Sequence, residues 1–208
     1  GWFIHPAVFV DDNDRPLGRW SCPLPRAAKP VAPETILPRL AVQNFIPLRS
    51  VMFRRSLAQT IGPMNEQLWF FGDWEYWIRL ADRAPAVYWP EPLACFRLHR
   101  LSQTATATRD REDIARQFDT VMEEVLALSR WTEGERKSLR KTMEFSRAAY
   151  MYLLAKGHGA PARAGDVLKK GLRVGPFGWY RHLRDSRLLE RVIPRLRIGF
   201  HRSQAETQ

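Results

Sequence analysis

The sequence predicts an α/β region over residues 1–106, followed by a basic α-helical region over residues 107–208. Short apolar runs separated by Pro, Gly, Asp and Asn predict strands and turns in the first region. Apolar residues that recur every three or four positions predict amphipathic helices in the second region. A hydrophobic share of 45% over 208 residues is enough for a buried core, so bulk disorder is excluded.

The first region begins with strand and turn patterns. The opening segment, GWFIHPAVFV, is typical of a strand, and residues 8–10 are its most apolar part. The DDNDRPLG stretch that follows has the residues of a turn. Five prolines lie within residues 22–38 and predict an extended loop, because proline interrupts helices and inner strands. Residues 50–53 then predict a buried strand, and residues 54–60 a short helix.

The rest of this region predicts one helix and two strands. Over residues 73–83 the apolar side chains follow helical spacing along one face, at Trp74, Trp77, Ile78 and Ala81. Residues 86–89 and 93–96 are short apolar runs on either side of two prolines. They predict two short strands.

The second region predicts four helices. Residues 112–130 place apolar side chains four and three positions apart, which is an amphipathic pattern. Thr132 and Glu135 have the spacing of a capping box, and they predict the start of a second helix. Gly and Pro residues separate the remaining helices. The second, third and fourth helices are expected over residues 133–156, 161–173 and 183–193.

The formal net charge is +11, and most of it lies in the second region. Residues 106–208 hold 21 Lys and Arg against 13 Asp and Glu. Such an excess attracts the phosphates of nucleic acids, anionic lipids or phosphorylated substrates. No zinc-ligand spacing, recognition-helix pattern or RNA-binding aromatic motif accompanies it, so we expect no nucleic-acid partner.

The two cysteines, Cys22 and Cys95, are too few for a disulfide framework, and neither belongs to a CxxC pair. A reducing, cytoplasmic setting is therefore expected. No apolar run reaches the roughly 20 residues that span a bilayer. The chain opens without Met and within a strand-like segment, so we expect it to begin partway through a domain.

One carboxylate is of particular interest, because aromatic residues surround Asp73 in the stretch FFGDWEYWIRLA. Asp is among the best helix N-cap residues, and Asp73 comes just before the apolar face of the predicted helix. Capping is therefore one interpretation. A catalytic base is the other, because an apolar setting raises the pKa of a carboxyl towards values useful for proton abstraction. The two roles are compatible.

Four motifs follow one another with short gaps: SVMFRRS, IGPMNEQL, GDWEYWIRLA and VYWPEPLACFRLHRLSQT. In this order they resemble the second half of family 2 glycosyltransferases, which have the GT-A fold of nucleotide-diphospho-sugar transferases. The resemblance covers residues 8–105. It implies that residues 1–106 are the acceptor-side half of a GT-A domain with a mixed sheet, and that residues 107–208 are a helical extension.

The resemblance implies an inverting transfer of a sugar from a nucleotide-sugar donor to a glycan or lipid-linked acceptor in polysaccharide biosynthesis. Asp73 matches the family's general base, which removes the proton of the attacking acceptor hydroxyl. Trp74 and Glu75 would lie beside the acceptor, with an aromatic face for its ring and a carboxylate for its hydroxyls. Trp77 is expected in the core.

The RLHRLS stretch matches a family motif that lies near the donor diphosphate. By this resemblance Arg97 and Ser102 would contact the substrate, and His99 would bind a divalent metal, Mg²⁺ or Mn²⁺, or donate to a phosphate oxygen. Two of these residues also have a simpler interpretation. Arg97 is then an ion-pair partner that braces the loop, and His99 is a hydrogen-bonding surface residue.

Two features depart from the family pattern. The nucleotide-binding half normally precedes these motifs, so we expect a fragment of a longer enzyme or a remnant without its donor half. The family's metal-binding Asp-x-Asp would fall near Pro6, where this sequence has no Asp. Asp12-Asn13-Asp14 has the letters of that motif, but a hairpin turn is the preferred interpretation.

Two other functions remain open. A glycosyltransferase-like module without chemistry could hold a glycan or a partner, which the missing aspartate near Pro6 favours. The basic stretch from Arg163 to Arg202 could instead bind an anionic membrane surface, as a peripheral protein at the inner face of the membrane. A solvated charged face is the simpler interpretation of this stretch. The side chains that would enter the membrane are Val192, Ile193, Leu196, Ile198 and Phe200.

Overall fold

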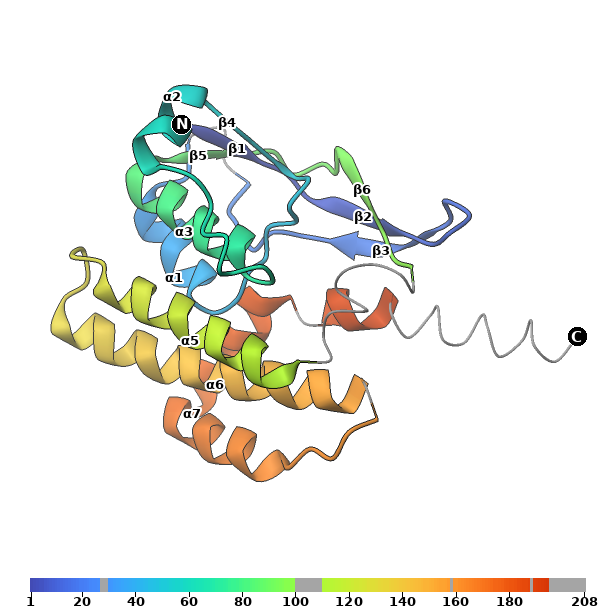
Figure 1. Ribbon diagram of the computed structural model, residues 1–208, viewed down its shortest axis with the longest axis vertical. Helices are drawn as coiled ribbons and strands as arrows, with labels where there is room; N and C mark the ends of the chain where they lie inside the picture. The colour runs from blue at the N-terminus through green and yellow to red at the C-terminus, as the bar shows by residue number, and fades with distance from the viewer. Residues whose placement is uncertain (27–29, 100–109, 158, 188, 195–208) are drawn as a thin grey trace, which may run out of the picture.

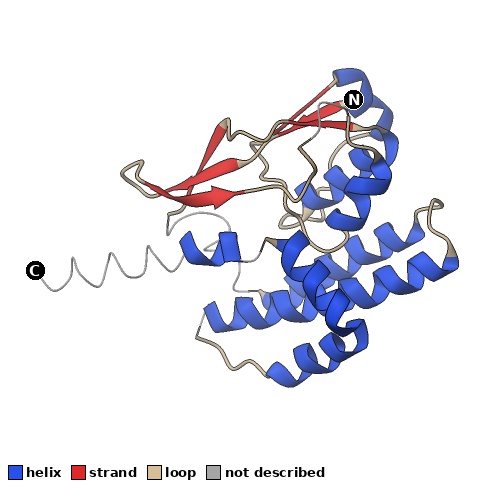
Figure 2. Ribbon diagram, turned by 180° about the vertical axis from the view of Figure 1, so that it is seen from behind, coloured by secondary structure: helices blue, strands red, loops and turns tan. Residues whose placement is uncertain are grey.

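The computed structural model describes residues 1–26, 30–99, 110–157, 159–187 and 189–194. Short strands and helices α1 to α3 form one part of the molecule, and the long helices α5 to α7 pack below it (Figures 1 and 2). This arrangement agrees with the predicted class, an α/β part followed by a helical part.

Within the described residues, the strands form two three-stranded mixed sheets, ordered β4-β1-β5 and β3-β2-β6. In each sheet the central strand has one antiparallel and one parallel neighbour. The opening segment forms two strands instead of one, because Pro6 has no N–H to donate to a ladder. The strands are β1 (Trp2–Ile4), β2 (Ala7–Val10), β3 (Pro16–Trp20), β4 (Val51–Phe53), β5 (Ala86–Tyr88) and β6 (Ala94–Arg97).

A tight turn joins β2 to β3, as the DDNDRPLG stretch predicts. Asp11 Oδ1 accepts hydrogen bonds from the backbone N–H groups of Asn13 and Arg15, each at 2.8 Å. Asp14 has a φ of 62°, in the left-handed region that Asp tolerates better than most residues. The turn interpretation of residues 12–14 is therefore confirmed.

The proline-rich segment contains a helix, α1 (Pro33–Leu40), where the sequence predicts an extended loop. Its first residue is a proline, which suits the first helical turn because the missing N–H would have no acceptor there. Burial of three apolar side chains outweighs the backbone hydrogen bond that Pro38 cannot donate. These side chains are Ile36, Leu37 and Leu40. The loop prediction is wrong for this part of the segment.

The other predicted elements of the α/β part are present with small shifts at their ends. The strand expected at residues 50–53 is β4, but the prediction that it is buried is wrong, because β4 lies at the edge of its sheet and Met52 and Phe53 are exposed. Helix α2 (Arg55–Ile61) follows it and ends at Gly62, whose φ of 82° favours glycine. Helix α3 (Gly72–Arg83) begins one residue before the predicted start.

Helices α5 (Arg111–Ala127) and α6 (Glu133–Gly157) confirm the first two helices predicted in the second region. The capping box is also confirmed. The Thr132 N–H donates to Glu135 Oε2 at 2.9 Å, and the Glu135 N–H donates to Thr132 Oγ1 at 3.3 Å. These reciprocal bonds satisfy backbone donors at the start of α6.

The last helices differ from the prediction. Helix α7 (Ala164–Ser186) continues past Gly175-Pro176 with a kink at Gly175, where φ is 67°. Pro176 then opens a further helical stretch, because proline is tolerated in a first helical turn. Arg187, with a φ of 50°, ends α7, and a short helical turn covers residues 189–194. The break predicted at Gly175-Pro176 is therefore confirmed, and the third predicted helix, 161–173, differs mainly at its start. The fourth predicted helix, 183–193, has the wrong boundaries.

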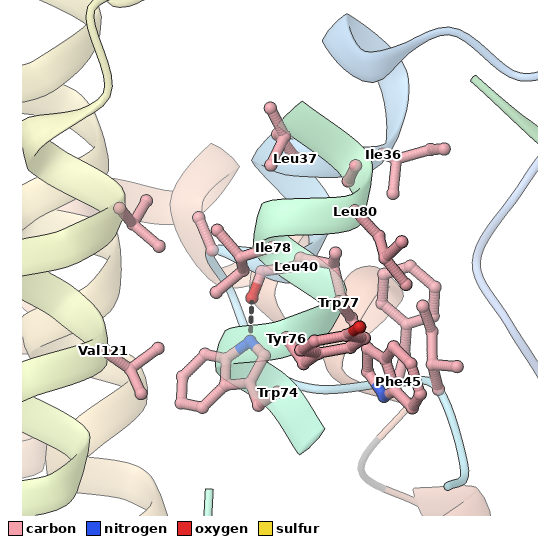
Figure 3. Close-up of a cluster of buried hydrophobic side chains, with 14 of the residues drawn as sticks. Ile36, Leu37, Leu40, Phe45, Trp74, Tyr76, Trp77, Ile78, Leu80 and Val121 are labelled. Atoms are coloured by element: carbon pink, nitrogen blue, oxygen red, sulfur yellow. Dashed lines mark hydrogen bonds between the residues drawn. The ribbon is translucent and has the colours of Figure 1, made fainter. Parts of the chain in front are cut away.

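One hydrophobic core joins the two parts of the molecule. Helix α3 lies between α1 and α5 (Figure 3), and Trp74 packs edge-on against Phe118 of α5 with ring centroids 4.9 Å apart. Trp77 is 1% exposed, as predicted for a core residue. The boundary predicted near residue 106 lies outside the described residues. The regions on either side of it share a core and do not form two separate ones.

Candidate functional site

Asp73 lies in the first turn of α3, one residue after the helix begins at Gly72. The N-cap residue of α3 is Phe71, so the prediction that Asp73 is the N-cap residue is wrong. Asp73 Oδ1 nevertheless accepts a hydrogen bond from the Trp74 backbone N–H at 2.7 Å. A negative charge in the first turn is also favoured by the helix dipole. The carboxylate is therefore held at the end of a packed helix.

Burial raises the pKa of Asp73 to about 6. Loss of solvation is the largest cause, because it disfavours the charged carboxylate. The Trp74 N–H, the Asn44 side chain and the positive charge of Arg191 act in the opposite direction. Asn44 Oδ1 accepts the Ile46 N–H at 3.0 Å, which leaves the amide nitrogen of Asn44 to donate to the carboxylate.

The site joins segments that are far apart in the sequence. Asn44 lies in the loop after α1, and Arg191 lies in the helical turn at residues 189–194. Arg191 Nη1 donates to the Asn44 carbonyl at 3.2 Å, and the guanidinium lies over the Trp20 ring, 5.1 Å from its centroid. A backbone contact and an aromatic contact thus hold a positive charge near Asp73. Neither Asn44 nor Arg191 is predicted from the sequence.

Asp73 is suited to accept a proton near neutral pH. With a pKa of about 6, roughly nine in ten of these carboxyl groups are ionised at pH 7. The raised pKa makes the group a stronger base than an exposed aspartate, and its hydrogen bonds fix its orientation. As a whole residue, Asp73 is partly exposed at the surface. This combination is what a general base requires.

The two residues after Asp73 have structural roles in place of the predicted contacts to an acceptor. Trp74 is fully buried, and its Nε1–H donates to the Leu40 carbonyl at 2.9 Å (Figure 3). Glu75 is 4% exposed and forms an ion pair with Arg79, with 2.9 Å between Oε2 and Nη2. The helix directs both side chains into the core. The structure therefore corrects the substrate-binding prediction for both residues.

The predicted phosphate and metal ligands lie at the end of β6. Arg97 donates to the Asp11 carbonyl at 2.7 Å and to Asp14 Oδ1 at 2.6 Å. These contacts brace the turn between β2 and β3, which supports the simpler interpretation of Arg97. His99 is exposed, and Ser102 lies outside the described residues. Among the described residues, neither Arg97 nor His99 forms a hydrogen bond or ion pair with the candidate base.

The described part of the chain contains no group of three or more His, Cys, Asp or Glu side chains placed to hold a metal ion. Pro6, where the family's metal aspartate would fall, is buried between β1 and β2 and has no ligand atom in its side chain. These residues do not fit the divalent metal that the resemblance implies. No chemical step is therefore assigned to a metal.

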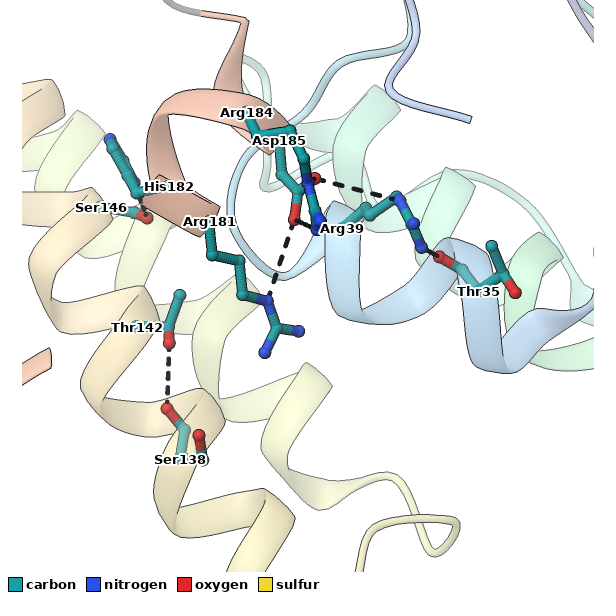
Figure 4. A network of polar contacts seen from close by, with 9 residues as sticks. All are labelled: Thr35, Arg39, Ser138, Thr142, Ser146, Arg181, His182, Arg184 and Asp185. Carbon is teal, nitrogen blue, oxygen red and sulfur yellow. Dashed lines mark hydrogen bonds and ion pairs between the residues drawn. The ribbon is translucent and has the colours of Figure 1, made fainter. Parts of the chain in front are cut away.

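A second buried polar cluster fastens α7 to α6 and α1 (Figure 4). Ser146 Oγ lies 3.0 Å from His182 Nδ1, and Asp185 pairs with Arg184 at 2.7 Å and with Arg39 of α1 at 3.9 Å. Burial lowers the pKa of His182 to about 4. Ser, His and Asp also form hydrolase triads, but these three side chains are at most 3% exposed, and Asp185 binds arginines. The cluster is structural.

No protein-family model matches this sequence, and no curated protein and no solved structure gives a significant match. The functional interpretation rests on the motifs and on the geometry around Asp73.

Proposed function

We propose that this chain is the acceptor-side part of a family 2-type glycosyltransferase with a GT-A-like fold, and that Asp73 is its general base. The observation that carries the proposal is the Asp73 carboxylate, which is partly buried at the start of α3 with its pKa raised to about 6. The four ordered motifs between residues 50 and 104 support the same assignment.

In the proposed reaction the Asp73 carboxylate takes the proton from an acceptor hydroxyl. The hydroxyl oxygen forms a bond to the anomeric carbon of a nucleotide-sugar, and the nucleoside diphosphate leaves with the electrons of the broken bond. One displacement inverts the configuration at that carbon. The Trp74 N–H and Asn44 hold the carboxylate in place. The acceptor is a glycan or lipid-linked sugar, which presents hydroxyl groups of the required kind.

Turnover of nucleotide-sugars tests the proposal. Wild type, Asp73→Asn and Glu66→Gln are assayed with UDP-, GDP- and dTDP-sugars, in this chain and in any longer natural protein that contains it. Asp73→Asn should lower kcat by about 10²–10⁴-fold with little change in KM, the usual range for a lost general base. Glu66 is exposed, so its variant controls for the loss of one negative charge.

Two outcomes would contradict the proposal. Turnover by Asp73→Asn within threefold of wild type would exclude the general-base role. For this chain alone, absence of turnover and of nucleoside diphosphate binding by calorimetry, with and without Mn²⁺, is the result expected of an acceptor-side part or of a binding module without chemistry. The same absence in a longer natural protein that contains the chain would exclude the glycosyltransferase assignment and favour the binding module. In the same titration His99→Ala tests the predicted metal ligand, and an unchanged metal dependence would exclude that role.

A second candidate function is favoured by the surface of α7. Lys169 and Arg173 are exposed on this helix among large apolar side chains that are also exposed. A basic helix with an apolar face suits the surface of an anionic membrane. Among the helices in the described ranges, none is long and apolar enough to cross a membrane. The apolar side chains are Leu168 (58% exposed), Leu172 (82%), Phe177 (87%), Tyr180 (65%) and Leu183 (51%).

We therefore propose that α7 attaches the enzyme peripherally to the inner, anionic face of a membrane, where a lipid-linked acceptor would be presented. Of the tail residues predicted to enter the membrane, Ile193 is 43% exposed and Val192 is partly buried. Leu196, Ile198 and Phe200 lie outside the described residues.

Liposome flotation tests this attachment. Vesicles with phosphatidylserine should bind the wild type more strongly at low salt than at high salt, and Leu172→Ser with Phe177→Ser should weaken binding at least tenfold. Both side chains are exposed, so the double variant should remain folded. Equal binding by wild type and double variant, or no binding by either, would exclude this role for α7.

A further inference from the structure

A cavity of about 290 Å³ lies between the strand ends of the α/β part and the C-terminal helical turn. Among the described residues, three arginines line it, Arg19, Arg26 and Arg187, and Glu190 is the one acidic side chain. Asp73 does not line this cavity. The remaining lining residues are Ser21, Cys22, Leu24 and Tyr88.

The positive charge of the cavity is in excess, and part of its donor capacity is unused. Glu190 is already engaged, because its Oε2 accepts the Ser21 N–H at 2.9 Å and its Oε1 accepts from Arg187 Nη1 at 3.2 Å. Arg19 donates through Nη2 to the Pro90 carbonyl. The Nε atoms of Arg19 and Arg187 are buried and have no hydrogen-bond partner within the described structure. A buried donor without an acceptor is unfavourable, so the protein does not fully satisfy these two guanidinium groups.

The three guanidinium groups all act electrostatically on the Tyr88 phenol. The charges of Arg19, Arg26 and Arg187 all oppose the rise in the pKa of the Tyr88 phenol, which burial raises to about 12. Tyr88 is therefore protonated at neutral pH. Its hydroxyl lies 3.4 Å from the Cys22 carbonyl, a long contact that a stronger acceptor could replace. The phenol thus adds a neutral donor to the charged ones.

We propose that this cavity is a binding site for a phosphate group, held by Arg19, Arg26 and Arg187. Three arginines and one glutamate leave two positive charges, which a phosphate dianion neutralises. Guanidinium groups pair with phosphate oxygens through planar, charge-assisted hydrogen bonds. The volume lies at the lower end of the range for ligand pockets, so it suits inorganic phosphate or a small phosphate monoester. The site does not depend on the proposed sugar transfer.

Phosphate in this cavity would also fix the C-terminal turn against β3. Arg187 and Glu190 belong to the same segment as Arg191, which contacts Asn44 and Trp20 beside the candidate base. Binding at the cavity should therefore stabilise the segment whose Arg191 contacts Asn44 and acts on the charge of Asp73.

Calorimetric titration of inorganic phosphate into the 208-residue chain tests the proposal. Wild type should bind one phosphate, and Arg26→Gln and Arg187→Gln should each lower the affinity at least tenfold. Arg173→Gln is the matched control, because Arg173 is exposed on α7 and does not line the cavity. Arg26 is also exposed, so its substitution should leave the fold intact.

The same titration with a short-chain phosphatidic acid, below its micellar concentration, identifies the source of the phosphate. If the Arg26 and Arg187 variants lose affinity for both inorganic phosphate and phosphatidic acid, a lipid headgroup can enter the cavity. Loss of inorganic phosphate alone would show a soluble ligand. Absence of phosphate binding by wild type, or an equal loss of affinity in Arg173→Gln, would overturn the proposal.

Discussion

Replacing Asp73 by Asn should stabilise the protein at neutral and alkaline pH. The folded protein raises the pKa of this carboxyl from 3.8 to about 6, mainly through burial. A charged Asp73 is therefore less favourable in the folded state than in the unfolded state. Asn has nearly the same shape, carries no charge, and retains an oxygen that can accept the Trp74 N–H. The substitution removes the unfavourable burial of the charge.

The magnitude follows from proton linkage. The carboxyl of Asp73 has a higher pKa in the folded protein than in the unfolded chain, so it destabilises the fold at pH values above both pKa values. This destabilisation disappears as pH falls through the folded pKa and then through the unfolded pKa. A shift of about two units corresponds to about 3 kcal/mol. Because Asp73 is partly exposed as a whole residue, solvent screening reduces this figure. We expect Asp73→Asn to raise the free energy of unfolding by about 1–3 kcal/mol at pH 8 and by little at pH 4.

Urea denaturation at pH 8 and pH 4 measures the effect, with Glu66→Gln as the control for loss of one negative charge at an exposed position. The control should change stability by less than about 0.5 kcal/mol. An Asp73→Asn variant that is no more stable than wild type at pH 8, or a gain in stability that is the same at both pH values, would show that burial of the Asp73 charge does not destabilise the fold. Such a result would mean that the carboxylate is well stabilised where it lies.

Three further predictions concern the core and its buried polar groups. Burial lowers the pKa of His182 to about 4, so neutral His182 contributes fully to folding stability above pH 6.5, and this contribution is lost as pH falls towards 4. In urea titrations, His182→Gln should reduce the acid-induced loss of stability by about 3 kcal/mol. An unchanged loss would contradict a neutral, buried His182. Phe118→Ala removes a fully buried contact between α5 and α3 and should lower the free energy of unfolding by about 3–5 kcal/mol. Circular dichroism and Trp fluorescence should still follow one unfolding transition, whereas two separate transitions would show independent cores. Glu75→Gln removes an ion pair with the partly exposed Arg79 and should lower the free energy of unfolding by about 2 kcal/mol in chemical denaturation. No change in stability would contradict the structural role of Glu75.

The sequence predicts best the elements whose local signals agree with their packing. The start of α6 carries a capping box, Thr132 and Glu135, and both of its hydrogen bonds form. The turn between β2 and β3 has Asp11, whose side chain accepts the backbone N–H groups of Asn13 and Arg15. Helix α1 fails as a prediction because its prolines oppose a helix locally, whereas burial of its apolar face favours one. Packing of this kind cannot be read from a short window.

The candidate site is predicted only in part for the same reason. The aromatic residues that flank Asp73 in the sequence, Phe71 and Trp74, do pack against each other in the structure, and burial raises the pKa of Asp73 as the sequence suggests. Trp74 and Glu75 are misassigned, although helical periodicity already indicates that Trp74 faces the core. Arg191 lies 147 positions from Asn44, which it contacts. Only tertiary docking of the C-terminal turn brings it beside Asp73, and no local pattern indicates that contact.

As the proposed general base, Asp73 should titrate near neutral pH, and NMR of its side-chain carboxyl carbon measures that titration without any assay of activity. The chain is labelled with ¹³C aspartate, and Asp73→Asn assigns the resonance. The predicted midpoint is close to pH 6, in line with a pKa of about 6 for this carboxyl. A midpoint near pH 4, the value of an ordinary aspartate, would contradict the account and leave Asp73 as a helix-stabilising residue.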